Sequence, residues 1–345
     1  MHKNFPEVTP SAGRGQVTIT DVANAAGVSP STVSYVITGK RSISVATRRR
    51  VEESIRALGY RRNGDALATR PTRIGVLAMA MPPFGGRPVS TETEFFTAAS
   101  EAAGRHRFHL LLVTHDEGSP VTSTALADAV IVLAVGDDDP RVPILLASGR
   151  PAVLIGAPGK HRGLPCVELD FAPAGEDCAA HLADLGHRSI VHLGLPAAPG
   201  VRPLHDLTGF LRSSLAIASH RQVRAAFHPC TPSADSVARC LDELLVPGGP
   251  TGLVVHDEAL LPLILATVER RGLRVPDDLS IVGVCSETVA RNHSARLTAV
   301  VVPARELGTL AVERAVQQLD GEPVAELELI VPWFVVGDST QGRKP

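Results

Sequence analysis

A group of basic and polar residues near the start of the chain has the side-chain types that bind anions. The basic residues are Lys40, Arg41 and Arg48–Arg50, and the polar positions ahead of them are Pro30, Ser31, Ser34 and Tyr35. Guanidinium and ammonium groups bind phosphate oxygens, and hydroxyl groups can bind phosphates or the edges of bases. The residue types therefore indicate a nucleic-acid surface, provided that the local backbone presents them together.

The distribution of charge agrees with that interpretation. The 345 residues carry a formal net charge of -2. Up to Arg73, however, there are 12 Lys and Arg residues against 5 Asp and Glu, and the remainder has 22 against 31. A basic segment ahead of an acidic body predicts a nucleic-acid-binding arm joined to a part with another partner.

Residues 17–38 contain two short helical patterns that could position this surface. The apolar residues at helical spacing are Ile19, Val22, Ala23 and Ala26 in the first pattern, and Val33, Val36 and Ile37 in the second. Gly27 can adopt the positive φ that ends a helix. Ser29 can cap the second helix, and Pro30 suits its first position because a proline lacks the N–H that would have no partner there. This arrangement predicts a helix-turn-helix unit.

A third helix should follow, with Ser44 as its cap, an apolar stripe and Gly59 at its end. The alternative is a small three-helix bundle whose charge excess is incidental. The outward polar residues of the second helix and the surrounding basic residues favour docking of that helix in a major groove.

From Ile74 onward, short apolar runs alternate with amphipathic stretches. Strands are expected at 74–79, 109–113, 129–135, 152–156, 189–194, 223–227, 252–256 and 280–284, and helices at 94–104, 173–185, 206–219, 233–245, 258–271 and 303–319. Continuous Val, Ile and Leu strands separated by helices predict parallel sheets buried on both faces. So many strands exceed one sheet, which favours two α/β lobes with a cleft between them.

Other function classes find little support in the sequence. We find no G-x-S-x-G, G-x-x-x-x-G-K-[ST] or H-E-x-x-H motif, so we expect neither an enzyme nor a cofactor or metal site. The start of the chain lacks the apolar stretch of a secretory signal, and no apolar run is long enough for a membrane span. The five scattered cysteines form no CxxC pair. We therefore expect a cytoplasmic protein with reduced, buried thiols.

The segments VTITDVANAAGVSPSTVSYVI and ISVATRRRVEESIRALGYRRN resemble the DNA-binding head of LacI/GalR-type bacterial transcriptional regulators. The body is similar as well: LGHRSIVHLG (185–194), Gly-Phe at 209–210, RGLRVPDDLSIVGV (271–284), LTAVVVPARELG (297–308) and DST (338–340) follow the family's order. The resemblance covers nearly the whole chain.

The resemblance implies a homodimeric regulator, which we expect to be a repressor that binds double-stranded operator DNA and a small, sugar-like effector. The implied fold is α/β, with an N-terminal three-helix head at 16–60, a linker at 61–73 and a two-lobed body at 74–340 like a periplasmic binding protein, with parallel sheets. The effector would lie in the cleft of the body and shift DNA affinity through its preference for one lobe arrangement.

The resemblance also assigns DNA contacts in the head. The family's base-reading positions fall on Pro30, Ser31 and Tyr35, and the candidate phosphate contacts are Thr18, Ser29, Ser34, Arg41 and Arg48. Tyr35 stands where the family usually has Arg, which can bind guanine bidentately, so the operator should differ from the family's commonest half-site. Helix capping is a second role for the same hydroxyl groups of Thr18 and Ser29.

The linker departs from the family pattern N-x-x-A-R-x-L. In N63-G64-D65-A66-L67-A68 the leucine comes two places early, and Asp65 would face phosphates. Leu67 is the best candidate for a minor-groove wedge, and a simple tether is the alternative.

In the effector cleft, the resemblance points to Asp170 in VELD and Asp257 in VVHDE, whose carboxylates could accept hydrogen bonds from hydroxyls or amines. Asp257 could equally be a helix cap. The other candidate effector residues are Asp206, Arg202, Ser286 and Phe84. Asp206 stands where the family usually has Arg, and Cys285-Ser286 stand at a position often occupied by Asp. An orphan regulator without an effector and, less favoured, an α/β enzyme with a DNA arm therefore stay open.

Overall fold

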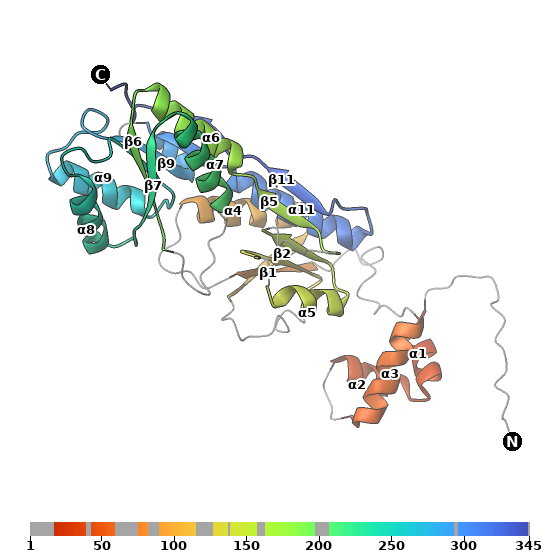
Figure 1. Ribbon diagram of the computed structural model, residues 1–345. Helices are drawn as coiled ribbons and strands as arrows, with labels where there is room; N and C mark the ends of the chain where they lie inside the picture. Colours follow the sequence, from red (N-terminus) through yellow and green to blue (C-terminus); the bar gives the residue numbers. More distant parts are fainter. Residues whose placement is uncertain are drawn as a thin grey trace. The chain divides into compact units, whose positions relative to one another are not determined.

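The computed structural model describes residues 17–38, 43–58, 75–81, 90–114, 127–136, 139–156, 163–196, 207–292 and 296–343. The chain divides into two compact units, Met1–Arg73 and Ile74–Pro345, which we call the head and the body. Figure 1 shows the helices of the head at the red end of the colour scale and the alternating strands and helices of the body in the colours that follow.

The head contains the helices α1 (Ile19–Ala26), α2 (Pro30–Thr38) and α3 (Val45–Leu58). A small cluster of its own holds them together, formed by the buried side chains Val22, Ala23, Ala26, Val33, Val36 and Val51. Gly27 has φ 64°, and its left-handed conformation ends α1, as predicted. The head therefore has its own core, and local residues determine where its helices begin and end.

The body contains two six-stranded sheets, each of which defines a lobe. In lobe 1 the strand order is β11-β5-β4-β3-β1-β2, with every pairing parallel. Its strands are β1 (Gly75–Met81), β2 (Phe108–Thr114), β3 (Ala129–Val132), β4 (Ala152–Ile155), β5 (Cys166–Leu169) and β11 (Leu327–Ile330). Its helices are α4 (Ser90–Arg105), α5 (Arg141–Ser148) and α11 (Ala304–Asp320).

Lobe 2 has the strand order β12-β10-β9-β8-β6-β7, and its pairings are parallel except for the edge strand β12. Its strands are β6 (Ser189–Gly194), β7 (Arg224–Pro229), β8 (Gly252–Val255), β9 (Ser280–Ser286), β10 (Thr298–Val302) and β12 (Trp333–Val335). Its helices are α6 (Ala172–Asp184), α7 (Thr208–His220), α8 (Ala234–Leu244), α9 (Leu260–Arg270) and α10 (Glu287–Asn292).

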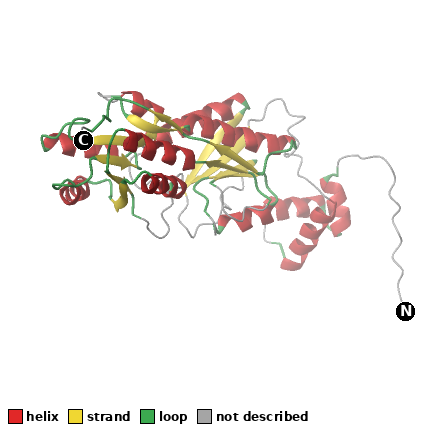
Figure 2. Ribbon diagram, turned by 45° about the horizontal axis from the view of Figure 1, so that its top comes forward, coloured by secondary structure: helices red, strands yellow, loops and turns green. Residues whose placement is uncertain are grey.

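The inner strands bury both of their faces, as their continuous apolar sequences predicted. In β3, Ile131 packs into the cluster that contains residues of α4 and α11, whereas Val130 and Val132 pack with residues of α5. In lobe 2, residues of β8 alternate in the same way between the side of α6 and α7 and the side of α8 and α9. Figure 2 shows the strands of the body lying among helices.

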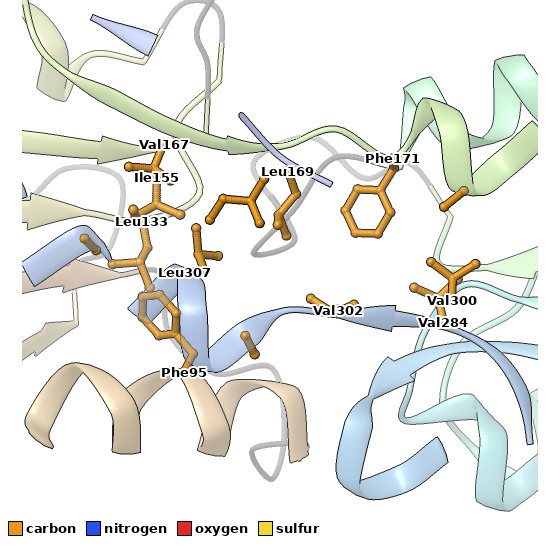
Figure 3. Close-up of a cluster of buried hydrophobic side chains, with 14 of the residues drawn as sticks. Phe95, Leu133, Ile155, Val167, Leu169, Phe171, Val284, Val300, Val302 and Leu307 are labelled. Atoms are coloured by element: carbon orange, nitrogen blue, oxygen red, sulfur yellow. The ribbon is translucent and has the colours of Figure 1, made fainter. Parts of the chain in front are cut away.

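The chain passes between the lobes at three places. The first lies between β5 and α6, the second between β10 and α11, and the third between β11 and β12. Figure 3 shows Leu169 and Phe171 at the first crossing and Val302 and Leu307 at the second, all within one buried apolar cluster. Buried residues of both lobes contribute to this cluster. The chain segments at the crossings are therefore packed into the core and are not extended linkers.

The segment after β12, which contains the DST motif of residues 338–340, is hydrogen-bonded to lobe 2. The hydroxyl group of Ser339 donates to the carbonyl oxygen of Ile281 at 2.6 Å and accepts from the backbone N–H of Thr298 at 2.9 Å. The hydroxyl of Thr340 lies 2.9 Å from Nε2 of His181. The motif therefore has a structural role in holding the end of the chain against β9 and β10.

Several predicted boundaries were wrong. The expected strand 129–135 ends at Val132, because Ala134 adopts φ 55° and turns the buried chain. The helix expected at 94–104 begins earlier, at Ser90. Two short helices, α5 and α10, and the strands β10, β11 and β12 were not among the predicted elements.

Candidate DNA-binding surface and effector site

The turn between α1 and α2 has the local interactions that its sequence predicted. The backbone N–H of Thr32 donates to Oγ of Ser29 at 3.2 Å, so Ser29 caps α2. Pro30 is the first residue of that helix, where no intrahelical hydrogen bond requires its missing N–H. These residues fix the angle at which α2 leaves the turn.

The outer side of α2 is partly open to solvent. Pro30 and Ser31 are exposed, whereas Ser34 and Tyr35 are half-buried. On the opposite side, Val33 and Val36 are buried in the core of the head. Exposed polar residues at the start of a helix that follows a tight turn can reach base edges in a major groove. Ser34 and Tyr35 offer less free surface than the sequence suggested.

The hydroxyl group of Thr18 has a structural partner. It donates to Oδ2 of Asp21 at 2.7 Å and accepts from the backbone N–H of Asp21 at 3.3 Å. The backbone N–H of Thr18 also donates to Oδ2 of Asp21 at 2.7 Å, which completes a capping box at the start of α1. The hydrogen bond from this hydroxyl lowers the pKa of the Asp21 carboxyl. Thr18 is exposed, so the cap leaves its side chain within reach of a phosphate.

The basic residues of α3 differ in how they are held. Arg49 forms an exposed ion pair with Glu53, with Nε 3.3 Å from Oε1. Arg48 is half-buried and Arg50 is exposed. Exposed ion pairs in helices contribute only about 0.3–0.5 kcal/mol, so Arg49 can exchange Glu53 for a phosphate at small cost.

In the body, the two aspartates that the resemblance selected lie where strands end, and each accepts a hydrogen bond from the backbone N–H two residues further on. Oδ1 of Asp170, directly after β5, accepts from the backbone N–H of Ala172 at 3.1 Å. Oδ1 of Asp257, which follows β8 by one residue, accepts from the backbone N–H of Ala259 at 2.8 Å. Burial raises the pKa of the Asp257 carboxyl. Neither bond is an N-cap of a helix, because the N-cap residues of α6 and α9 are Phe171 and Ala259 and neither helix has a side-chain cap. The second oxygen of Asp257 has no hydrogen bond among the described residues.

Ser286 lies at the end of β9 and is fully buried. Its hydroxyl group accepts from the backbone N–H of Val289 at 3.3 Å, which caps α10. Its own backbone N–H donates to Oε2 of Glu258 at 2.8 Å. The side chain of Ser286 therefore caps a helix, and the backbone N–H of Ser286 is the group that contacts Glu258.

Glu258 was not among the predicted site residues. Besides the N–H of Ser286 in lobe 2, its carboxylate accepts from the N–H of Ser90 and the hydroxyl of Thr91, each at 2.6 Å. Ser90 and Thr91 begin α4 in lobe 1, so the start of this helix meets the end of β9 and the segment after β8 in lobe 2. The sequence shows Glu258 directly after Asp257, but nothing local indicates partners 167 and 168 residues away.

A pair of buried histidines next to this region was also missed. Nδ1 of His192 lies 2.8 Å from Nε2 of His256, and Nε2 of His192 lies 3.2 Å from the hydroxyl of Ser214. Burial lowers the pKa of His192 to about 4 and that of His256 to about 3. The ring of Phe210 packs edge-on against His256, with centroids 5.0 Å apart. Both imidazoles are therefore neutral near pH 7. Together with the hydroxyl of Ser214 they form a buried hydrogen-bonded network beside the ring of Phe210.

The remaining candidate site residues lie outside the described ranges. They are Arg41 and Leu67 for DNA and Phe84, Arg202 and Asp206 for the effector. The linker 61–73 lies outside these ranges as well. Within the described part of the chain, no three His, Cys, Asp or Glu side chains are grouped to hold a metal ion, and no helix is long and apolar enough to cross a membrane.

Comparison with known proteins assigns both parts of the chain. The family described as "Bacterial regulatory proteins, lacI family" matches residues 18–63, and "Periplasmic binding protein-like domain" matches residues 179–340. Catabolite control protein A of Priestia megaterium is 25% identical over 320 residues, which cover 89% of this chain and 94% of the relative. The regulator CelR of Thermobifida fusca is 28% identical over 336 residues, with 92% and 96% covered.

Solved structures share the fold. A lac repressor dimer bound to operator and the anti-inducer ONPF matches with a TM-score of 0.63 and 22% identity, covering 95% of this chain and 100% of that one. A complex of CelR with cellobiose matches with a TM-score of 0.62 and 22% identity, covering 94% and 100%.

The head, the two-lobed body and these matches define a DNA-binding transcriptional regulator. Its helix-turn-helix unit and its binding-protein-like lobes occur in the order that the sequence resemblance predicted. Residues 18–63 match the lacI family of bacterial regulatory proteins and residues 179–340 match the periplasmic binding protein-like domain, so the chain carries both parts found in LacI-type regulators.

Proposed function

We propose that this regulator is a cytoplasmic repressor, without enzymatic activity, that binds its operator as a homodimer and responds to a small effector held at the carboxyl ends of the body strands. The main support is the construction of the head. Its core is separate from that of the body. Gly27 ends α1, Ser29 caps α2, and the first residues of α2, Pro30 and Ser31, are exposed to solvent.

A dimer would carry two heads and read a pseudo-palindromic operator. Edge strand β2 supports self-association, since among the described strands it pairs with β1 alone and exposes Leu111 and Leu112, which are 42% and 47% accessible. Exposed neighbouring leucines on a sheet edge are typical of a surface that another chain covers.

For base reading we propose Pro30, Ser31 and Tyr35, and for phosphates Thr18, Ser29, Ser34, Arg41 and Arg48, with Leu67 as the minor-groove wedge. For the effector we propose Asp170, Asp257 and Ser286 together with Phe84, Arg202 and Asp206. The free oxygen of Asp257 and the remaining lone pairs of Asp170 can accept hydrogen bonds from the hydroxyl groups of a sugar-like ligand.

The DNA-binding part is tested by titrating the full-length protein against duplex from the region upstream of its own gene and against random duplex at the same moderate salt concentration. Specific binding should be tighter by roughly a thousandfold or more. Tyr35→Ala should reduce the difference between sites that vary by one base pair, by about 1–3 kcal/mol at the base that Tyr35 reads. Equal affinity of the wild-type protein for both duplexes would show that the head does not read sequence.

The effector part is tested with a thermal-shift panel of sugars, nucleosides and amino acids, followed by product analysis of each ligand that binds. We expect stabilisation by a ligand that is recovered unchanged, and a weaker effect of that ligand on Asp257→Asn. Recovery of a converted product would instead identify an enzyme with a DNA-binding arm.

A further inference from the structure

The carboxylate of Glu258 accepts hydrogen bonds from both lobes of the body. Oε1 accepts from the backbone N–H of Ser90 at 2.6 Å, and Oε2 accepts from the hydroxyl of Thr91 at 2.6 Å and from the backbone N–H of Ser286 at 2.8 Å. Ser90 and Thr91 open α4 in lobe 1, whereas Glu258 and Ser286 belong to lobe 2. One side chain therefore receives three short hydrogen bonds from two lobes.

Each of these donors is suited to a negative charge. The N–H of Ser90 belongs to the first turn of α4, where backbone N–H groups lack intrahelical partners and the helix dipole favours an anion. Thr91 is only 4% accessible, so its hydroxyl depends on a protein partner. Hydrogen bonds to an ionised carboxylate are shorter and about twice as strong as those between neutral groups.

A second contact between the same two lobes is much weaker. The backbone N–H of Thr288 donates to Oε1 of Glu94, with a nitrogen to oxygen distance of 3.4 Å, at an exposed position. Glu94 offers a matched comparison, since it is also a glutamate that links α4 to lobe 2. It differs from Glu258 in the number, length and burial of its hydrogen bonds.

We propose that Glu258 is a clasp that holds the two lobes in one arrangement through these hydrogen bonds, and that this arrangement is the form that binds the operator. The second half of this statement rests on the proposed function. An effector that releases the operator would then have to favour an arrangement in which Glu258 no longer reaches Ser90 and Thr91, because a ligand shifts an equilibrium only through its different affinity for the two states.

The clasp itself is tested by hydrogen exchange of the full-length, ligand-free protein. Glu258→Ala should accelerate exchange together in the peptide that contains Ser90 and in the peptide that contains Ser286, and Glu258→Gln should have a smaller effect because one oxygen remains. Glu94→Gln, the control, should leave the Ser286 peptide unchanged. Thr91→Val removes one donor from the other lobe and provides a second variant if Glu258→Ala does not fold.

The regulatory role is tested by operator affinity without effector. Glu258→Ala should weaken binding at least fivefold, the lower end of the roughly 5–150-fold range of allosteric coupling, while Glu94→Gln stays at the wild-type value. The effects of Thr91→Val and Glu258→Ala should not be additive in the double variant, because both remove the same contact.

Unchanged hydrogen exchange at either peptide in Glu258→Ala would overturn the clasp. Accelerated exchange with wild-type operator affinity would overturn its regulatory role. A wild-type protein that prefers no DNA sequence would refute the proposed function and, with it, the operator-binding half of this proposal, while the exchange experiment would still decide whether Glu258 holds the lobes together.

Discussion

The neutral histidine pair in lobe 2 makes the stability of the body dependent on pH. The pKa of His192 is lowered to about 4 and that of His256 to about 3, because burial penalises the charged imidazolium, whereas an unfolded histidine titrates near 6.5. Between these values the unfolded chain binds more protons than the folded one, so acidification favours unfolding. Above pH 6.5 the contribution is complete and constant.

We predict that the free energy of unfolding falls as the pH is lowered from 6.5 toward 4, by at most about 1.4 kcal/mol per pH unit for each histidine. Urea denaturation at a series of pH values measures this slope. His256→Asn should reduce the slope, whereas His220→Asn, at an exposed position of α7, should preserve it. A wild-type midpoint that does not change over this interval would contradict the assignment of buried, neutral imidazoles.

At the scale of elements, α4 and α11 approach so closely that one glycine is required between them. A Cβ atom on Gly308 of α11 would lie 2.3 Å from the carbonyl oxygen of Phe95 in α4, well inside van der Waals contact. Because backbone atoms cannot move aside as a flexible side chain can, a larger residue at position 308 must separate the helices.

We predict that Gly308→Ala lowers the free energy of unfolding of the body by about 1–3 kcal/mol. The matched control is Gly104→Ala in α4, where nothing lies within 4 Å of the added Cβ. That change should leave stability equal or raise it by up to about 1 kcal/mol, since alanine favours a helix more than glycine does. Guanidinium denaturation compares the two variants, and equal midpoints would argue against the close contact.

Elements whose ends depend on nearby residues could be predicted from the sequence. The caps at Thr18, Ser29 and Gly27 depend on neighbours within four residues, so their sequence pattern was sufficient. The end of β3 could not be predicted, because the apolar sequence continues through a buried turn after the strand. In this turn the side chain of Arg141 donates hydrogen bonds to the carbonyl oxygens of Leu133 and Ala134. The short helices α5 and α10 have too few residues for a clear amphipathic period.

The effector region shows the same limit. Asp170 and Asp257 could be found because each follows an apolar run and resembles a family position, and their hydrogen bonds to the backbone are local. The partners of Glu258 and of the histidine pair come from other parts of the chain, 22 to 168 residues away. Tertiary packing brings these groups together, and no periodicity in a single sequence records it.

For the whole molecule, the uneven charge predicts how DNA binding responds to salt. The first 73 residues hold 12 basic and 5 acidic residues, and the acidic excess lies in the rest of the chain. Phosphate contacts release counterions, so each one adds about 0.9 to the slope of the logarithm of affinity against the logarithm of salt concentration. The head should supply this slope and the body should not.

We predict that Arg48→Gln weakens binding to all duplexes alike and lowers the magnitude of the salt slope by about one. Arg274→Gln provides the control, since this exposed arginine of the body pairs with Asp277 and Asp278. Fluorescence anisotropy between 50 and 200 mM salt, roughly the range over which such affinities change most, gives both slopes. The same loss of slope in both variants would show that the body also contacts phosphates, against this prediction.

The three crossings have a consequence for how the protein is made. Lobe 1 is assembled from the early strands β1 to β5 and from α11 and β11, which come after most of lobe 2 in the sequence. During translation, β5 therefore lacks its neighbouring strand β11 until about residue 330 has left the ribosome. The surface of α4 that packs against Gly308 also stays uncovered until α11 has been made. The first lobe to begin is thus completed only after nearly all of the second has been translated, so lobe 1 cannot finish folding ahead of lobe 2.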